Sequence, residues 1–161
     1  MYKKILAPVD GSEFAECSLD HVREVAAGCG AKEVIFILVI EPFPPSAGLA
    51  EDWRLKLEKD AQADAEAYLA KLVDHLNLKS KKIEVKTIIV HGKPARNILK
   101  YASENEVDLI IMATHGRSGL SHWVFGSVAE RILRHSHVPV LIVTPPEFRD
   151  RRQQSRGEDS G

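Results

Sequence analysis

The sequence has little of what several protein classes depend on. It has only two cysteines, Cys17 and Cys29, which form no C-x-x-C pair, so neither a disulfide framework nor a structural zinc site is expected. We expect both to be buried free thiols. The formal net charge is -1, which provides no general field to attract nucleic acid or anionic lipid. Any partner must therefore be inferred from a local site.

Long apolar runs are also missing. No stretch approaches the roughly 20 residues that a helix needs to span a bilayer. The opening MYKKILAPVD has a short apolar part that Pro8 and Asp10 interrupt, which is not typical of a signal peptide. We therefore expect a cytoplasmic protein without a membrane partner.

What the sequence does have is an alternation of short runs rich in Val and Ile with longer amphipathic runs. Short apolar runs of this kind are typical of buried parallel strands. Five strands are expected, at Lys3–Pro8, Glu33–Ile40, Ile83–Val90, Asp108–Ala113 and Pro139–Thr144. Helical patterns lie between them, at Ser12–Gly28, Glu51–Leu76, Pro94–Asn105 and Ser127–Ser136. The order predicts a doubly wound α/β fold, with a five-stranded parallel sheet in the order 3-2-1-4-5 and helices on both faces.

The length of 161 residues fits one domain, which we place at residues 1–146. The remaining residues, 147–161, have Phe148 as their only large apolar side chain and are predicted to be a disordered tail. Arginines and acidic residues balance in this tail, so it is not expected to bind nucleic acid. The segment Pro42–Ala50 contains three prolines and a glycine, which predicts an irregular loop at a pocket mouth.

Local signals mark the helix boundaries. Asp10 is placed to cap the first helix, and Gly30 to end it. Pro94 has the fixed φ of a first-turn residue in the third helix. Ser127 and Glu130 stand in the S-x-x-E spacing of a capping box, which predicts that the fourth helix begins at the Gly-Ser pair.

The glycine-rich segment before that helix is the candidate binding site. Ligands of open parallel sheets bind beyond the carboxyl ends of the strands, where the winding direction reverses, and residues 9–12 and 114–126 follow the two strands at the expected reversal. A helix start offers unpaired N–H groups to an anion such as phosphate. Glycines at 116, 119 and 126 allow close approach of the backbone. Asp10 can accept hydrogen bonds from a ribose or adenine, so a nucleotide would suit both loops.

The two commonest phosphate-binding signatures are absent. The segment has no GxxxxGK[ST], since Gly126-Ser127 follows Phe125 and no lysine is near. No GxGxxG follows the first strand either. Those two nucleotide folds are therefore disfavoured.

Another pattern is present. An HG pair, nine intervening residues, a GS pair and then VAERILRHSHVPVLIV resemble the universal stress protein family, whose nucleotide-binding members carry G-x2-G-x9-G-[S/T] after the fourth strand. The resemblance covers Met1 to Pro145 and includes the opening KKILAPVDGSE. In this chain Ala113 replaces the first glycine of the pattern.

The resemblance implies a fold like that of the adenine nucleotide alpha hydrolases and a ligand, ATP with Mg²⁺ or Mn²⁺. It implies that adenosine would be contacted by Pro8, Val9, Asp10 and Val39. It places Met112 and Ala113 near the ribose, and it implies phosphate contacts from Gly116, Gly126, Ser127 and Val128. From the residues themselves, Gly119 would allow close approach of the loop, and Arg117 could reach a terminal phosphate or be merely solvated.

Several alternatives stay open. Asp10 and Ser127 can be simple helix caps, and the histidines at 115, 122, 135 and 137 are expected to be solvated or capping residues rather than metal ligands. The methyl group of Ala113 can weaken nucleotide binding, which would leave a dimeric stress adaptor. No Ser-His-Asp or paired-carboxylate arrangement is evident, so catalytic residues are not expected and at most a slow ATPase or nucleotidyl-transfer activity is considered. The last strand, Val138–Thr144, is predicted to lie at the sheet edge and to pair with a second copy in a homodimer.

Overall fold

The computed structural model describes residues 1–42, 50–76, 78, 82–114 and 126–144. The predicted tail at residues 147–161 and most of the proline-rich loop lie outside this part of the chain. The elements follow one another as β1 (Lys4–Val9), α1 (Glu13–Glu16), α2 (Leu19–Cys29), β2 (Glu33–Ile40), α3 (Glu51–Leu76), β3 (Glu84–His91), α4 (Pro94–Glu104), β4 (Leu109–Ala113), α5 (Ser127–His135) and β5 (Val140–Val143).

The five strands form one parallel sheet in the order β3-β2-β1-β4-β5. The predicted fold class and strand order are confirmed. β1 lies in the middle, and the winding direction reverses between β1 and β4. The two edges of the sheet are β3 and β5, so the predicted edge position of the last strand is confirmed as well.

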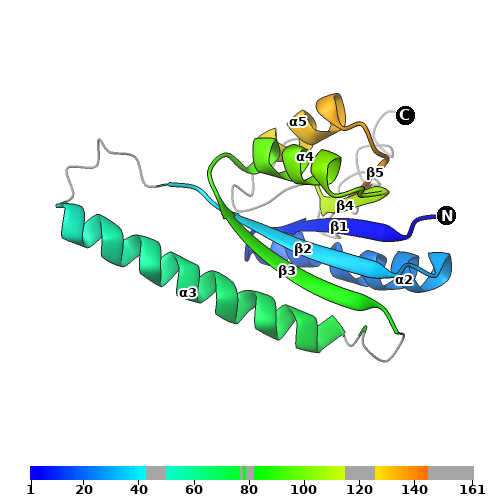
Figure 1. Cartoon of the computed structure of the whole chain (residues 1–161), viewed down its shortest axis with the longest axis horizontal. Helices are drawn as coiled ribbons and strands as arrows, with labels where there is room; N and C mark the ends of the chain where they lie inside the picture. The colour runs from blue at the N-terminus through cyan, green and yellow to red at the C-terminus, as the bar shows by residue number, and fades with distance from the viewer. Residues whose placement is uncertain (43–49, 77, 79–81, 115–125, 145–161) are drawn as a thin grey trace, which may run out of the picture.

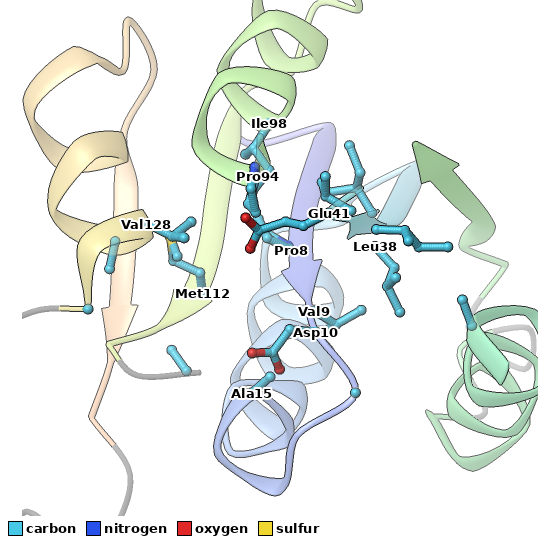
Figure 2. Close-up of a pocket in the computed structure, with 18 of the residues that line it drawn as sticks. Pro8, Val9, Asp10, Ala15, Leu38, Glu41, Pro94, Ile98, Met112 and Val128 are labelled. Carbon is cyan, nitrogen blue, oxygen red and sulfur yellow. The ribbon is translucent and has the colours of Figure 1, made fainter. Parts of the chain in front are cut away.

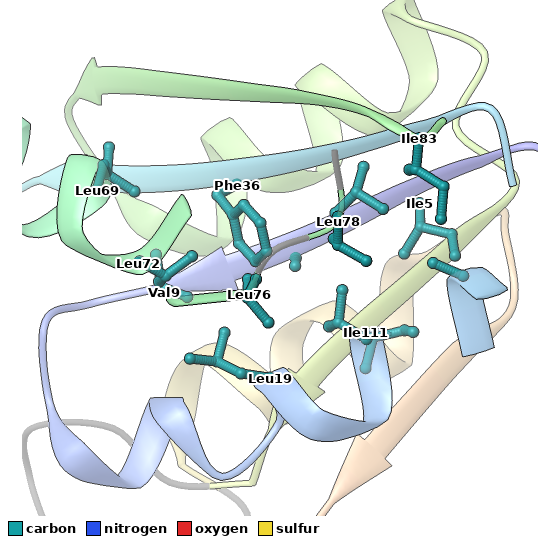
Figure 3. Packing of buried hydrophobic residues seen from close by; sticks show 14 of the residues in the cluster. Ile5, Val9, Leu19, Phe36, Leu69, Leu72, Leu76, Leu78, Ile83 and Ile111 are labelled. Atoms are coloured by element: carbon teal, nitrogen blue, oxygen red, sulfur yellow. The ribbon is translucent and has the colours of Figure 1, made fainter. Parts of the chain in front are cut away.

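Helices cover both faces of the sheet (Figure 1), and an apolar layer lies between the helices and the sheet on each face. Successive strand residues point to opposite faces, so Ile5 and Phe36 belong to the layer under α2 and α3, whereas Leu6 and Ile35 belong to the layer under α4 and α5. Figure 3 shows the first layer, in which strand side chains face those of α2 and α3. Both faces are covered, which explains why the strands read as continuous apolar runs.

The long helix α3 is buried along only part of its length. Its buried residues are Ala65, Leu69, Leu72 and Leu76, all in the C-terminal half. Near its start, Trp53 and Leu55 are 60% and 46% exposed. Figure 1 shows α3 running along the β3 side of the sheet. Neither α3 nor any other helix in the described ranges is long and apolar enough to cross a membrane.

The first predicted helix is broken in two. The hydroxyl of Ser18 donates to the carbonyl of Ala15 at 2.8 Å, and this local bond competes with regular helix continuation. Ser12, rather than Asp10, is the N-cap of α1, since its Oγ accepts from the N–H of Ala15 at 3.2 Å. Gly30 ends α2 in the left-handed region, with φ 61°, as predicted.

The two cysteines depart partly from expectation. Both thiols are free, as predicted. Neither is fully buried, because Cys17 lies in the break between α1 and α2 and Cys29 is the last residue of α2.

Polar groups pair with one another where the strands begin. Oδ2 of Asp108 accepts from the backbone N–H groups of Lys3 and Lys4, at 2.7 and 2.8 Å. These two hydrogen bonds, of which the one from Lys4 has the larger effect, hold the pKa of Asp108 below its usual value. Glu33 lies between the ammonium groups of Lys4 and Lys86, and the hydrogen bond from Lys86 is the main cause of its lowered pKa.

Candidate functional site

A cavity of about 650 Å³ opens at the carboxyl ends of β1, β2 and β4. The first residues of α4 and α5 form one side of it, and α3 forms the opposite side (Figure 2). In Figure 2, Met112 of β4 lies beside Val128 of α5. The cavity lies at the winding reversal, where an open parallel sheet most often binds its ligands.

Most of the predicted binding residues line this one cavity. The structure brings together Pro8, Val9, Asp10, Val39, Met112, Ala113, Gly126, Ser127 and Val128. Predicted contacts from Gly116, Arg117 and Gly119 lie outside the described residues. Segments far apart in the sequence therefore meet around one space, which is the geometry that a bound small molecule requires.

The start of α5 brings residues with unpaired helical N–H groups to the cavity. The first bond of the helix runs from the N–H of Glu130 to the carbonyl of Gly126, at 2.9 Å. The N–H groups of Ser127, Val128 and Ala129 consequently have no acceptor within the helix, and all three residues line the cavity. Such a group of donors at the positive end of a helix favours an anion.

The predicted capping box at this helix is wrong. Gly126 is the N-cap and Ser127 is the first helical residue, with no side-chain cap hydrogen bond. The reason is a bond from the N–H of Gly126 to the carbonyl of Thr114, at 2.9 Å, which fixes Gly126 beside β4. The carboxylate of Glu130 instead pairs with Arg134, at 3.0 Å.

Ala113, which replaces a glycine of the family pattern, lies at the end of β4 and pairs with Val143. Its backbone has no positive φ, so an alanine is accepted without strain. The side chain is buried and borders the cavity. Its methyl group thus occupies some of the cavity wall without distorting the strand.

The loop after β1 holds Asp10 in place. Oδ1 of Asp10 accepts from both the N–H and the hydroxyl of Ser12, at 3.0 and 2.6 Å. Gly11 between them has φ 79°, a value that favours glycine. The helix-cap explanation for Asp10 is therefore replaced by a tight turn that positions its carboxylate at the cavity.

Sequence reasoning missed the α3 side of the cavity. Ala61, Asp64, Ala65 and Tyr68 line it, together with Glu41 after β2. The four α3 residues have the i, i+3, i+4, i+7 spacing of one helix face, and this spacing was the available signal. It could not show whether that face packs on the sheet or borders a cavity.

The phenol of Tyr68 has an unusual environment. Its oxygen is buried and makes no hydrogen bond of ordinary geometry with a described residue, although the carboxylate of Glu16 lies close enough to interact with it. Burial is the main cause that raises the pKa of Tyr68 well above its usual range, and the nearby carboxylates of Glu16 and Asp10 add to it. The hydroxyl therefore stays protonated at physiological pH.

The histidines offer no alternative site within the described ranges. His135 and His137 are exposed, whereas His115 and His122 lie outside those ranges. In the part of the chain that the structure covers, no three His, Cys, Asp or Glu side chains are grouped so that they could hold a metal ion.

Comparison with known proteins agrees with this architecture. Universal stress protein MJ0577 of Methanocaldococcus jannaschii is 35% identical over 89% of this chain and 95% of its own length, and the MJ0577 structure superposes with a TM-score of 0.80, covering 90% and 97% of the two chains. Two more distant structures share the fold. One is a universal stress protein in complex with cAMP, 24% identical with a TM-score of 0.65, covering 89% and 97% of the chains. The other, from Arabidopsis thaliana with AMP bound, is 17% identical with a TM-score of 0.61, covering 88% and 91%.

The family assignment rests on nearly the whole described chain. The model of the universal stress protein family matches residues 1–144, which include every strand and helix around the cavity. Together with the MJ0577 likeness, this match means that the chain belongs to the universal stress protein family.

Proposed function

We propose that this protein binds an adenine nucleotide, ATP in the first instance, in the cavity at the carboxyl edge of the sheet, and acts as a cytoplasmic nucleotide-dependent regulator or stress-survival factor. One observation carries the proposal. Ser127, Val128 and Ala129, whose N–H groups have no acceptor within α5, line a cavity of about 650 Å³ that Asp10 also lines. Donors for phosphate and an acceptor for a nucleoside thus border the same space.

The residues that line the cavity suggest how the nucleotide lies in it. The phosphates would lie against Gly126, Ser127 and Val128, with Gly116, Arg117 and Gly119 contributing from outside the described ranges. The adenosine would lie toward the other strands. In this arrangement its contacts are Pro8, Val9, Asp10 and Val39, with Met112 and Ala113 near the ribose.

A divalent ion accompanying ATP would not need a protein-held site. Because the described residues hold no cluster of metal ligands, Mg²⁺ or Mn²⁺ would take its ligands chiefly from the phosphate oxygens, as Mg²⁺ commonly does in nucleotide sites. The two structures with bound cAMP and AMP support the choice of ligand, since cAMP and AMP are adenine nucleotides and the proteins that hold them share this fold.

The direct experiment is mass spectrometry of the purified protein for a co-purifying adenine nucleotide, followed by calorimetric titration with ATP and magnesium, and with GTP for comparison. We expect saturable ATP binding at one site per chain and weaker GTP binding. Absence of ATP binding would favour the adaptor without nucleotide, with Ala113 as the first residue to restore to glycine. Product release above that of a Gly126→Asp variant would favour the slow ATPase.

We also propose that two chains pair through β5. This strand is an edge of the sheet, and Leu141 on it is 37% exposed. The carbonyls of Pro139 and Val143 accept bonds from β4. The backbone groups of the alternate residues, Val140 and Ile142, therefore point to the open edge, where a second strand can pair with them.

An Ile142→Pro variant tests this dimer. Proline removes one outward N–H but leaves the bonds to β4, so an edge strand tolerates it. We expect sedimentation at micromolar concentration to show dimers for the wild type and monomers for Ile142→Pro. Ile142→Ala is the control, because it removes side-chain packing and keeps the N–H. A monomeric wild type would contradict the pairing.

A further inference from the structure

Glu41 is a carboxylate at the cavity for which the proposed nucleotide contacts give no role. It follows directly after β2 and lines the cavity. The residue is exposed, and none of the ion pairs between described residues involves it. Its oxygens are therefore accessible to a molecule that enters the cavity.

The end of β2 sets the direction of this side chain. The pairing with β3 continues to the last residue of β2, since the N–H of Gly92 donates to the carbonyl of Ile40 at 2.9 Å. Continued alternation along the chain places Glu41 on the same face as Val39, which packs against the layer under α4 and α5. Figure 2 shows the carboxylate of Glu41 pointing across the cavity toward Pro94 of α4.

The order of the strands places Glu41 at the base end of the proposed ligand. The start of α5, where we propose that the phosphates lie, follows β4, and β1 and then β2 come next across the sheet. Because the ribose separates the phosphates from the base, phosphates at α5 leave the base to lie toward β2. Asp10, Glu41 and Asp64 line the cavity, and the described lining residues include no lysine, arginine or histidine. Carboxylates near β2 repel the phosphates and favour this orientation.

A carboxylate beside the base distinguishes one purine from another. A carboxylate only accepts hydrogen bonds. At the 6-position adenine has an amino group, which donates, whereas guanine has a carbonyl oxygen, which accepts. Two acceptors that face each other repel, so an acceptor at this position both favours adenine and opposes guanine.

We propose that the carboxylate of Glu41 recognises the 6-amino group of adenine by accepting a hydrogen bond from it, and that this contact selects adenine over guanine nucleotides. The inference rests on the proposed nucleotide binding and assigns a specificity-determining residue to that site. The start of α5 would bind the phosphates of any nucleotide, whereas Glu41 distinguishes the base.

The experiment is a double-mutant cycle in which one change is made in the protein and the other in the ligand. The wild type and Glu41→Ala are titrated by calorimetry with ATP and with purine riboside 5′-triphosphate, which has hydrogen in place of the 6-amino group. We expect Glu41→Ala to weaken ATP binding about three- to tenfold, which corresponds to the loss of one partly solvated hydrogen bond. Binding of purine riboside 5′-triphosphate should not weaken. The affinity for GTP should rise relative to that for ATP.

Two further variants separate the hydrogen bond from the charge. Glu41→Gln keeps an oxygen that can accept from the amino group, so its ATP affinity should lie closer to that of the wild type than the affinity of Glu41→Ala does. Asp60→Ala removes the same charge from an exposed residue of α3 that does not line the cavity, and it should bind all three ligands as the wild type does. Tm without ligand should be nearly the same for all of these exposed substitutions, which verifies that each variant folds.

The outcomes separate this inference from the proposed function. If the wild type binds ATP and Glu41→Ala binds it equally well, the role of Glu41 is wrong and nucleotide binding stands. An equal loss of affinity for purine riboside 5′-triphosphate also overturns the role, because the lost contact then does not involve the 6-amino group. If the wild type binds none of the three nucleotides, the proposed function fails and this inference fails with it.

Discussion

Polar groups at the amino ends of the strands differ in their surroundings from those at the carboxyl ends. Where the strands begin, Asp108 accepts from two backbone N–H groups and Glu33 pairs with two lysines. At the other end, the first residues of α5, whose N–H groups have no acceptor within the helix, line a cavity together with Asp10 and Tyr68. At the first end the polar groups pair within the chain itself, whereas at the second they border the cavity in which we propose that a nucleotide binds.

This difference follows from the direction of the strands. In a parallel sheet every helix that follows a strand begins at the same edge, so helix N-termini and their N–H groups gather there. The opposite edge receives helix ends and short connections that can pair locally. Changes where the strands begin should therefore alter the free energy of unfolding, and changes where the strands end should alter ligand binding.

The largest effect should come from Gly126→Asp at the cavity. An N-cap aspartate would accept from the N–H groups of α5 and place a negative charge at the proposed phosphate position. We expect ATP affinity to fall at least about a hundredfold, as for an uncompensated charge in a binding site. Because Asp is a good N-cap and Gly126 has an ordinary φ of -54°, Tm should stay the same or rise.

A Gly28→Asp variant is the control for that experiment. Gly28 is exposed on α2, and open space surrounds the position of a new side chain. It adds the same charge away from the cavity and should bind ATP normally. Equal ATP affinity in the Gly126→Asp variant and the wild type would mean that the phosphates do not lie at α5.

A smaller effect of the opposite kind is expected from Asp108→Ala at the other edge. Two charge-assisted bonds to Lys3 and Lys4 are lost, but water replaces them because the carboxylate is only half-buried. We expect the free energy of unfolding to fall by about 1 kcal/mol and ATP affinity to stay constant. Chemical denaturation and calorimetry measure the two quantities. Asp74→Ala, on the exposed side of α3, should change neither.

The effect of Asp108→Ala should also depend on pH. The pKa of Asp108 is lowered in the folded protein, so its contribution is complete above the unfolded value of about 4 and is lost as pH falls through the folded value. The difference between wild type and variant should stay constant from neutral pH to about pH 5 and shrink below about pH 4. A difference that grows in acid would contradict this assignment.

The smallest effect should come from Ser127→Ala. Since Ser127 is the first helical residue and not the cap, stability should change by less than about 0.5 kcal/mol. Loss of one hydroxyl near the phosphates should weaken ATP about two- to fivefold. Ser103→Ala, whose hydroxyl bonds only within α4, is the control. A stability loss above about 1 kcal/mol would restore the capping explanation.

Much of the fold was predictable because the three central strands, β1, β2 and β4, are buried on both faces. Continuous apolar runs such as EVIFILVI predict a buried strand. The order of the strands then predicted that the loops after β1 and β4 meet. The helix starts at Glu51, Pro94 and Ser127 were predicted as well. The cap of α5 was not, because Ser127 matched a capping pattern whereas Gly126, bonded to the carbonyl of Thr114 just after β4, is the N-cap.

The α3 side of the site was beyond sequence reasoning for a different reason. Tyr68 occurs in a helix whose apolar and polar residues are mixed, and nothing local distinguishes it from Tyr101. Whether it lines the cavity depends on how far along the sheet α3 lies. That position is set by the packing of Leu69, Leu72 and Leu76 against the strands.

The sequence by itself determined the order of the elements, the parallel sheet and the loops that carry Asp10 and Gly126, because burial and backbone freedom are properties of short segments. Only the tertiary structure decided that Tyr68 would border the same cavity with its hydroxyl buried. The state of a buried polar group depends on every element packed around it, and no single segment contains that information.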